Sequence, residues 1–317
     1  RTDILQNVPY PGPSICRFDR SRFAHGPIDQ NGTHKTSAQP DQISKTRTDM
    51  TEHESHDASR YYQDHWRSIE PERMQRYEAM FQWRAEMESL IAPANISPGL
   101  SVVDYGCGPG ALSIELARRV TASGTVHAVD INPDFLEKTR AAGDAAGVAK
   151  QLHTVATDGD RIDIADHSVD RVICKNVLEY VPDPAVTIGE FKRVLAPGGI
   201  GHVIDSDWGA LLAEPFGTEL DRIMAAANIA FRTPLIGRKL YGLFRAAGFQ
   251  DVRVQILANA DTRGGMRPVL RNMATYARTS GELDDAVIDA FLAALDRATD
   301  DGTWLAVLPQ FLVTGVA

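Results

Sequence analysis

The residues whose types and spacing most clearly suggest chemistry are an acid followed by three glycines at alternate positions. The pattern reads Asp104-x-Gly106-x-Gly108-x-Gly110. Asp130 follows Gly110 by 20 residues. Glycines let the chain turn tightly and let a ligand lie against bare backbone. An acid at this distance can accept hydrogen bonds from both hydroxyls of a ribose. The pattern therefore predicts a site for a nucleoside-containing cofactor.

Two cofactor classes fit this spacing. Gly106-x-Gly108-x-x-Ala111 satisfies the loose dinucleotide fingerprint. The diphosphate of a dinucleotide would lie over the turn, however, and Asp104 would repel it. S-adenosylmethionine instead presents an ammonium and a sulfonium, which a nearby acid attracts. The residues therefore favour S-adenosylmethionine, with a nicotinamide-dependent oxidoreductase as the alternative.

The elements that must position these residues are short apolar segments alternating with amphipathic ones. Strands are expected at 100–105, 125–131, 151–157, 171–175, 200–206, 251–257 and 304–316. Helices are expected at 111–120, from 133, and at 184–196, 216–230, 236–247 and 282–298. This alternation predicts an α/β fold whose mostly parallel sheet is covered on both faces. The apolar stripe of 282–298 is expected to cover the carboxyl edge of the sheet or a partner subunit.

Four segments in order make the pattern more specific. They are VVDYGCGPG (102–110), AVDIN (128–132), HSVDRVICKNVLEYVPDP (167–184) and RVLAPGGIGHVIDSD (193–207). Over about residues 98–257 the sequence resembles class I S-adenosylmethionine-dependent methyltransferases. Within them it resembles the small-molecule branch that includes the ubiquinone/menaquinone-biosynthesis C-methyltransferases. The resemblance implies a Rossmann-like, seven-stranded, mostly parallel sheet with an antiparallel last strand.

The resemblance also implies a set of cofactor-binding residues. The three glycines would line the methionine part of the cofactor, and Asp130 would bind its ribose. Backbone carbonyls after the fourth strand would meet its ammonium, and Asp158 would lie beside the adenine amino group. The full set is Asp104, Gly106, Gly108, Gly110, Asp130, Ile131, Asp158, Gly159, Lys175 and Asn176, with Arg84 as a candidate for the cofactor carboxylate.

Methyl transfer requires alignment of three atoms more than it requires a base. The two candidate bases are Tyr180, which replaces a histidine frequent in the family, and Asp207. The aromatic helical stretch at 59–92 is expected to fold over the sheet edge as a lid. Residues expected to line the substrate pocket are Tyr62, Trp66, Trp208 and Phe231. We expect a small, largely apolar substrate and no metal; the acceptor atom (O, N or C) stays open.

Composition narrows the function classes further. The chain has 317 residues, with 33 Lys+Arg against 42 Asp+Glu and a net charge of −9. This balance argues against nonspecific nucleic-acid binding, which needs cations to displace counterions from phosphates. No apolar run reaches the roughly 18 residues of a transmembrane helix. Three cysteines without metal or disulfide spacing indicate a reducing, cytoplasmic compartment.

The domain organisation follows from the same reading. Residues 1–49 are expected to be a disordered leader or a non-native extension, because prolines and polar residues dominate there. Residues 50–97 would form the helical lid. Residues 98–317 would form the methyltransferase domain, with a helical insertion at about 258–303. A monomer or homodimer is expected, and a non-methylating member of the same fold remains an alternative.

Overall fold

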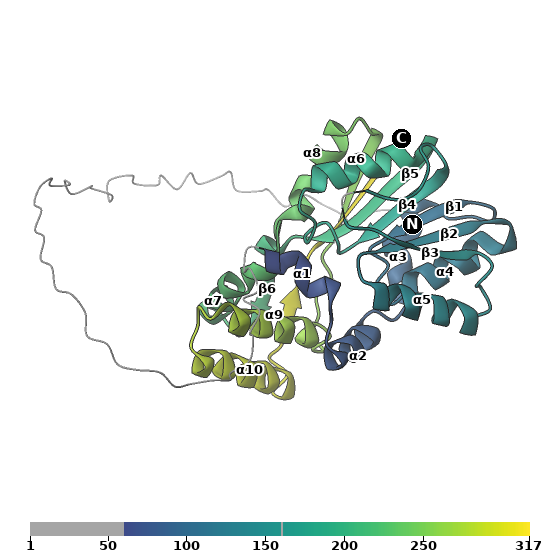
Figure 1. Cartoon of the computed structure of the whole chain (residues 1–317). Coiled ribbons are helices and arrows are strands. Elements are labelled where there is room, and N and C mark those ends of the chain that lie inside the picture. Colours follow the sequence, from purple (N-terminus) through teal and green to yellow (C-terminus); the bar gives the residue numbers. More distant parts are fainter. Residues whose placement is uncertain (1–59, 160) are drawn as a thin grey trace, which may run out of the picture. The chain divides into compact units, whose positions relative to one another are not determined.

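The computed structural model describes residues 60–159 and 161–317 (Figure 1). The predictions for residues 1–49, and for the first part of the expected lid, lie outside the described residues. No helix in the described part of the chain is long and apolar enough to cross a membrane. The described residues belong to one compact unit.

A seven-stranded sheet forms the centre of this unit. Its strand order is β3-β2-β1-β4-β5-β9-β7. β9 pairs antiparallel with both β5 and β7, whereas the other neighbours pair in parallel. The mostly parallel sheet with an antiparallel last strand is therefore confirmed. The strands are β1 (Ser101–Tyr105), β2 (Thr125–Asp130), β3 (Leu152–Ala156), β4 (Val169–Lys175), β5 (Leu195–Ser206), β7 (Gln250–Leu257) and β9 (Gln310–Val316).

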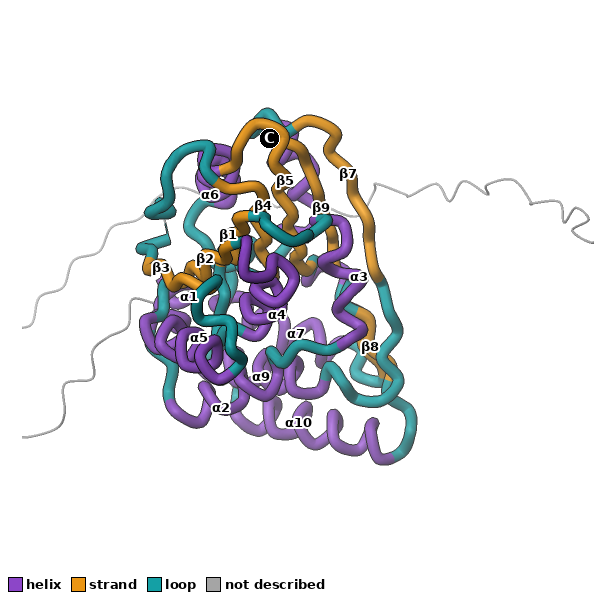
Figure 2. Tube along the Cα trace, turned by 90° about the vertical axis from the view of Figure 1, so that its right-hand side faces the viewer, coloured by secondary structure: helices purple, strands orange, loops and turns teal. Residues whose placement is uncertain are grey.

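Helices cover both faces of the sheet (Figure 2). The helices are α4 (Ala111–Val120), α5 (Pro133–Ala145), α6 (Pro184–Val194) and α8 (Ile236–Ala246). Leu116 of α4 and Leu136 of α5 pack on one side in a cluster with Val102. Phe191 of α6 and Phe244 of α8 pack on the other side. These apolar faces explain the consecutive apolar residues in the middle of β1 (102–103) and β4 (172–174), since both faces of the sheet are buried there.

A second group of elements packs at the carboxyl ends of β4 and β5. It comprises β6 (Leu212–Glu214), α7 (Thr218–Ala226), α9 (Arg267–Ser280), α10 (Asp285–Asp300) and β8 (Leu305–Val307). Its apolar cluster includes Tyr180 and Trp208, which directly follow β4 and β5. The stripe on α10 packs against α7 and α9, so it does not cover the sheet edge itself.

One secondary-structure prediction was wrong in this region, and one was incomplete. The apolar run 304–316 forms two strands, because Pro309 lacks the N–H that a continuous ladder needs. β8 then pairs with β6 in a separate two-stranded sheet, while β9 enters the main sheet. Helix α9 lies within the helical insertion expected at about 258–303, although its own bounds were not predicted; Leu270, Met273 and Ala277 bury one face of it.

The N-terminal elements are α1 (Tyr61–Arg67), α2 (Pro71–Met80) and α3 (Glu88–Ile91). α1 lies between the sheet and α9 (Figure 1). The backbone oxygen of Trp66 accepts a hydrogen bond from Asn132 Nδ2 at 2.8 Å. Arg67 Nη2 donates to the backbone oxygen of Asp158 at 2.8 Å. α1 is thus attached to the loops that follow β2 and β3.

Candidate functional site

The turn between β1 and α4 has a conformation that requires glycine. Gly106, Gly108 and Gly110 all have positive φ, at 74°, 54° and 89°. A Cβ on Gly110 would lie 2.6 Å from Thr139 Oγ1, which is too close for any side chain. A Cβ on Gly108 would meet only Phe81, at 3.9 Å. At Gly110 the backbone is covered by neighbouring residues, whereas at Gly108 it is open to a ligand.

Asp130 joins this turn to the end of β2. Its Oδ2 accepts a hydrogen bond from the Gly108 N–H at 2.8 Å, and its Oδ1 accepts one from the Asn132 N–H at 2.9 Å. Burial raises the pKa of this carboxyl to about 6, although the backbone donors favour its charged form. The side chain is 8% exposed and lines a pocket. Asp130 therefore shapes the turn and still presents carboxylate lone pairs to a ligand.

Asp104 lies beneath the same pocket. It is 2% exposed and accepts a hydrogen bond from Ser113 Oγ at 2.5 Å. Burial raises the pKa of Asp104 to about 7, and repulsion from Asp130 acts in the same direction. Two buried acids with raised pKa values make this end of the pocket favourable for a cation.

Lys175 lies at the end of β4 and lines the pocket. Its ammonium makes no hydrogen bond or ion pair with any residue in the described ranges. Burial lowers its pKa, while Asp205, Glu179 and Asp104 attract the charged form. Lys175 can therefore offer its charge to an anionic group of a ligand.

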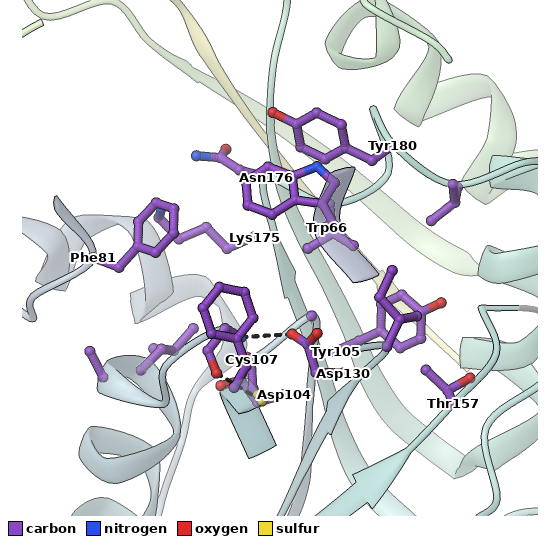
Figure 3. A pocket seen from close by; sticks show the side chains of 18 of the residues that line it. Trp66, Phe81, Asp104, Tyr105, Cys107, Asp130, Thr157, Lys175, Asn176 and Tyr180 are labelled. Carbon is purple, nitrogen blue, oxygen red and sulfur yellow. Dashed lines mark hydrogen bonds between the residues drawn. The ribbon is translucent and has the colours of Figure 1, made fainter. Parts of the chain in front are cut away.

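The pocket joins these acids to an apolar end (Figure 3). Its empty volume is about 1150 Å³, part of which is open to solvent. The carboxyl ends of β1, β2 and β4 supply the polar end. The apolar end comes from the N-terminal elements and the segment after β4. The residues of the apolar end are Trp66, Met80, Phe81, Trp83, Met87, Tyr180 and Val181.

Comparison with known proteins places this site in a family. Residues 103–203 match a family model described as "Methyltransferase domain". The chain contains a class I S-adenosylmethionine-dependent methyltransferase domain. The chain is 34% identical over 101 residues to the ubiquinone biosynthesis O-methyltransferase of Xylella fastidiosa, covering 32% of this chain and 39% of that protein.

A further relative is an uncharacterized 37.1 kDa protein of transposon TN4556 from Streptomyces fradiae. It is 31% identical over 169 residues, which are 52% of this chain and 48% of that protein. The chain thus spans about half the length, or less, of these two curated relatives.

Solved structures share the fold of the methyltransferase domain. Phosphoethanolamine N-methyltransferase 2 of Haemonchus contortus has a TM-score of 0.55 at 14% identity, covering 80% of this chain and 60% of that one. The YcgJ protein of Bacillus subtilis has a TM-score of 0.51 at 16% identity, covering 73% of this chain and 97% of that one. At these identities the likeness shows the fold alone.

Most of the predicted cofactor residues line the methyltransferase pocket. Gly110 does not; it supports the turn from behind through Thr139. Asp158 is exposed outside the lining, and its neighbours line the pocket instead. Arg84 is exposed and precedes a short helical turn, also outside the lining. The predicted residues within the lining are Asp104, Gly106, Gly108, Asp130, Ile131, Gly159, Lys175, Asn176, Trp66 and Tyr180.

Asp207 is not placed to act as a base. It is fully buried, and its Oδ2 and Oδ1 accept hydrogen bonds from Arg238 Nε at 2.6 Å and Arg238 Nη2 at 2.5 Å. The Arg238 N–H at the start of α8 donates to Oδ2 at 3.1 Å. Asp207 therefore anchors α8 to the end of β5, and it lies outside the pocket lining.

Three predicted substrate residues also lie outside the lining. Tyr62 packs against the guanidinium of Arg232, 5.8 Å from its ring centroid. Trp208 Nε1 donates to a carboxylate oxygen of Glu179. Phe231 stacks on Tyr180, with ring centroids 5.5 Å apart, and contacts Trp208. Trp208 and Phe231 thus form a layer behind Tyr180 rather than the pocket surface.

Several residues that line the pocket were not predicted from the sequence. Gln63 lines the pocket where Tyr62 was expected. The amide nitrogen of Gln63 lies close to Gly159, so a Cβ on Gly159 would be 2.9 Å from it. Thr157 lines the pocket where Asp158 was expected. The remaining unassigned residues are mainly Met80, Phe81, Trp83, Met87, Leu112, Phe135 and Val181. The dense Met and aromatic spacing between 80 and 87 is the sequence signal that points to them.

Proposed function

We propose that this domain transfers a methyl group from S-adenosylmethionine to a small, largely apolar metabolite. The observation that carries the proposal is one pocket that joins an acidic, glycine-lined end to an aromatic and thioether end. A charged cofactor suits the first end, and an apolar acceptor suits the second. The pocket lining in the described residues includes one cationic side chain, Lys175, which argues against a phosphorylated acceptor.

The polar end fits S-adenosylmethionine in charge and shape. Gly108 leaves room against the backbone, and Asp130 offers a carboxylate to the ribose hydroxyls. Asp104 favours the ammonium, either directly or through water. Lys175 has no partner among the described residues and suits the cofactor carboxylate. The remaining residues that we propose to bind the cofactor are Gly106, Ile131, Gly159 and Asn176, together with Gln63 and Thr157.

When bound, the cofactor supplies an activated methyl group that is displaced in line from sulfur. The chain's own contribution is alignment and exclusion of water. Trp66 and Phe81 lie over the open side of the turn and shield it from solvent (Figure 3). The Tyr180 hydroxyl is protonated at neutral pH even at its ordinary pKa of 10.0, and burial raises that pKa further. Tyr180 therefore positions an acceptor rather than deprotonates it.

The proposal extends to the setting of the enzyme. Cys107 and Cys174 are buried and form no disulfide, which suits a reducing cytoplasmic compartment. We propose a monomer or homodimer that acts on a small molecule and not on nucleic acid. We also propose that the N-terminal helices serve as the lid of the 98–317 domain, with the helices at about 258–303 as its insertion.

Two measurements test the proposal. Calorimetry with S-adenosylhomocysteine and with NADH identifies the cofactor class, and binding of NADH alone would favour the oxidoreductase. A cell extract is then incubated with the protein and isotopically labelled S-adenosylmethionine, and mass spectrometry detects labelled metabolites. We expect one labelled, largely apolar product. Cofactor binding without any labelled product would indicate a non-methylating member of the fold.

A further inference from the structure

Gln63 places an amide without hydrogen-bond partners at one end of the pocket. The residue belongs to α1, is 4% exposed and lines the pocket. Neither its amide oxygen nor its amide nitrogen has a hydrogen-bond partner within residues 60–159 and 161–317. The fully inaccessible side-chain atoms that lack a partner in those ranges do not include either atom, so the amide opens into the cavity. A buried amide of this kind is suited to a ligand that completes its hydrogen bonds.

The amide lies where the adenine of S-adenosylmethionine would be expected. Asp130 is proposed to hold the ribose, and Ile131 follows it at the end of β2. Gly159 comes after β3, the strand that pairs with β2. A Cβ on Gly159 would lie 2.9 Å from Gln63 Nε2 and 3.9 Å from Ile131 Cγ2. These three residues therefore meet just beyond the ribose site, on the side away from the glycine turn.

The other polar side chains at this end are turned away or already engaged. Asp158 is exposed and lies outside the pocket lining. Thr157 lines the pocket, but its hydroxyl donates to the backbone oxygen of Arg161 at 2.7 Å and accepts from the Gly159 N–H at 3.1 Å. Gln63 is thus a side chain at this end whose donor and acceptor are both available to a ligand.

The chemistry of the amide matches adenine. A glutamine amide offers one oxygen acceptor beside two N–H donors. Adenine carries its 6-amino donor next to a ring-nitrogen acceptor on either side. The two groups can therefore form a pair of parallel hydrogen bonds, which is the pairing that glutamine makes with adenine in nucleic-acid recognition.

We propose, resting on the function above, that Gln63 recognises the adenine base and that this contact holds α1 closed over the cofactor. Gln63 Oε1 accepts from the 6-amino group, and Nε2 donates to the neighbouring ring nitrogen. Trp66 is three residues further on, so it lies on the same side of α1 and covers the pocket (Figure 3). Binding of the adenine therefore completes the wall of the acceptor end, and the cofactor binds before the acceptor.

The attachments of α1 lie on either side of this contact. Asn132 Nδ2 donates to the backbone oxygen of Trp66 at 2.8 Å, from the loop after β2. Arg67 Nη2 donates to the backbone oxygen of Asp158 at 2.8 Å, in the loop after β3. An adenine held by Gln63 between these two loops adds a further link between them and the helix.

The test compares S-adenosylhomocysteine with its analogue that carries hydrogen in place of the 6-amino group. Calorimetry measures both dissociation constants. We expect the native protein to bind S-adenosylhomocysteine roughly ten-fold more tightly, because the analogue leaves the buried amide oxygen of Gln63 without a donor. Equal affinities would overturn the inference.

Variants assign the preference to its residue. Gln63→Leu keeps the size of the side chain and removes both polar atoms, so the affinity ratio of the two ligands should fall to about one. Gln63→Glu keeps an oxygen acceptor for the 6-amino group and should keep the preference. Gln75→Leu is the matched control, because Gln75 is an exposed glutamine of α2 outside the pocket lining. A ten-fold ratio that persists in Gln63→Leu would assign the preference elsewhere and refute the role of Gln63.

Hydrogen exchange tests the link to helix closure. Saturating S-adenosylhomocysteine should slow exchange of the α1 amides, and the analogue at equal saturation should slow it less. In Gln63→Leu the two ligands should protect α1 equally. Equal protection of α1 by both ligands in the native protein would refute the coupling between the base and the helix.

The outcomes separate this inference from the proposed function. Melting temperatures of all variants show whether each one folds. If the native protein binds S-adenosylhomocysteine and the analogue equally well, the role of Gln63 is refuted while the proposed cofactor stands. If the native protein binds neither ligand, the proposed function and the inference are both refuted.

Discussion

We expect the buried carboxyl of Asp104 to lower the free energy of unfolding of the protein. The variant Asp104→Asn should therefore be more stable. Burial raises the pKa of Asp104 from 3.8 to about 7. The native state therefore binds the proton more tightly than the unfolded state does. In that case the native state loses stability as the pH rises from about 4 to about 7, where the unfolded chain ionises and the native one does not. Asparagine carries no such charge and can still accept from Ser113 Oγ.

The expected gain follows from the size of the shift. The difference between 3.8 and about 7 corresponds to about 4 kcal/mol in the free energy of unfolding at pH 8. At pH 5 the expected gain in the free energy of unfolding is only about 2 kcal/mol. The gain is smaller because pH 5 lies only slightly above the unfolded-state pKa, so ionisation stabilises the unfolded chain less than it does at pH 8. Urea unfolding followed by tryptophan fluorescence at both pH values measures the two differences.

Asp207→Asn is the control for this experiment. Asp207 is also fully buried, but it is ion-paired with Arg238, so its loss should destabilise the protein at both pH values. Asp104→Asn should also weaken binding of S-adenosylhomocysteine, because the cofactor ammonium loses its counter-charge. A variant that is no more stable than the native protein at pH 8, or a gain that does not change with pH, would refute the reasoning.

Two further predictions concern substitutions in the site, and one concerns a deletion. Asp130→Ala should weaken binding of S-adenosylhomocysteine by about 2 kcal/mol or more, because charged hydrogen bonds are lost, whereas calorimetry of exposed Asp158→Ala should show little change. Lys175→Met should weaken that binding roughly ten-fold and leave 5′-methylthioadenosine, which lacks the carboxylate, unaffected; equal losses for both ligands would contradict the assignment. Deleting residues 1–49 should change neither melting temperature nor cofactor affinity, and a fall of several degrees would show that they pack on the domain.

The sheet and the turn could be predicted because their signals are local. Glycines at alternate positions and an acid 20 residues later fix a turn without reference to the rest of the chain. The bounds of helix α9, within the expected helical insertion, could not be predicted in the same way. Its buried face includes Ala274 and Ala277 beside Leu270 and Met273, so small residues supply much of the contact. Their burial depends on α7, which packs there only in the folded protein.

The orientation of α1 shows a different limit. Successive residues of a helix point about 100° apart, so a one-residue error in phase exchanges the residues that face a pocket. Tyr61, Tyr62, His65 and Trp66 spread aromatic rings around much of this short helix, and the apolar pattern does not fix its phase. Hydrogen bonds from Asn132 to Trp66 and from Arg67 to Asp158 fix it in the folded protein. Neither partner is close in sequence.

The role of Asp207 was likewise set by a distant partner. Asp205 and Asp207 both follow the same buried strand, and nothing in their spacing distinguishes them. In the folded protein Arg238 neutralises Asp207. Asp205 instead accepts hydrogen bonds from the backbone N–H groups of Leu178, Ser206 and Val177, and burial raises its pKa to about 7. A sequence can place an acid at a strand end, but its charge state depends on which cation the fold brings to it.

The acids around the pocket share one physical property that connects stability with function. Burial raises the pKa of Asp104, Asp130, Asp205 and Glu179, and Lys175 is the cation that lies among them. Holding these carboxyls out of water costs stability in the empty protein. A ligand that carries an ammonium and a sulfonium would favour their charged forms and recover part of that cost on binding. Burial of these carboxyls therefore lowers the stability of the empty protein, and the same burial makes the site selective for a cationic cofactor. After methyl transfer the sulfonium charge is lost, so the same acids would hold the product less strongly than the substrate cofactor.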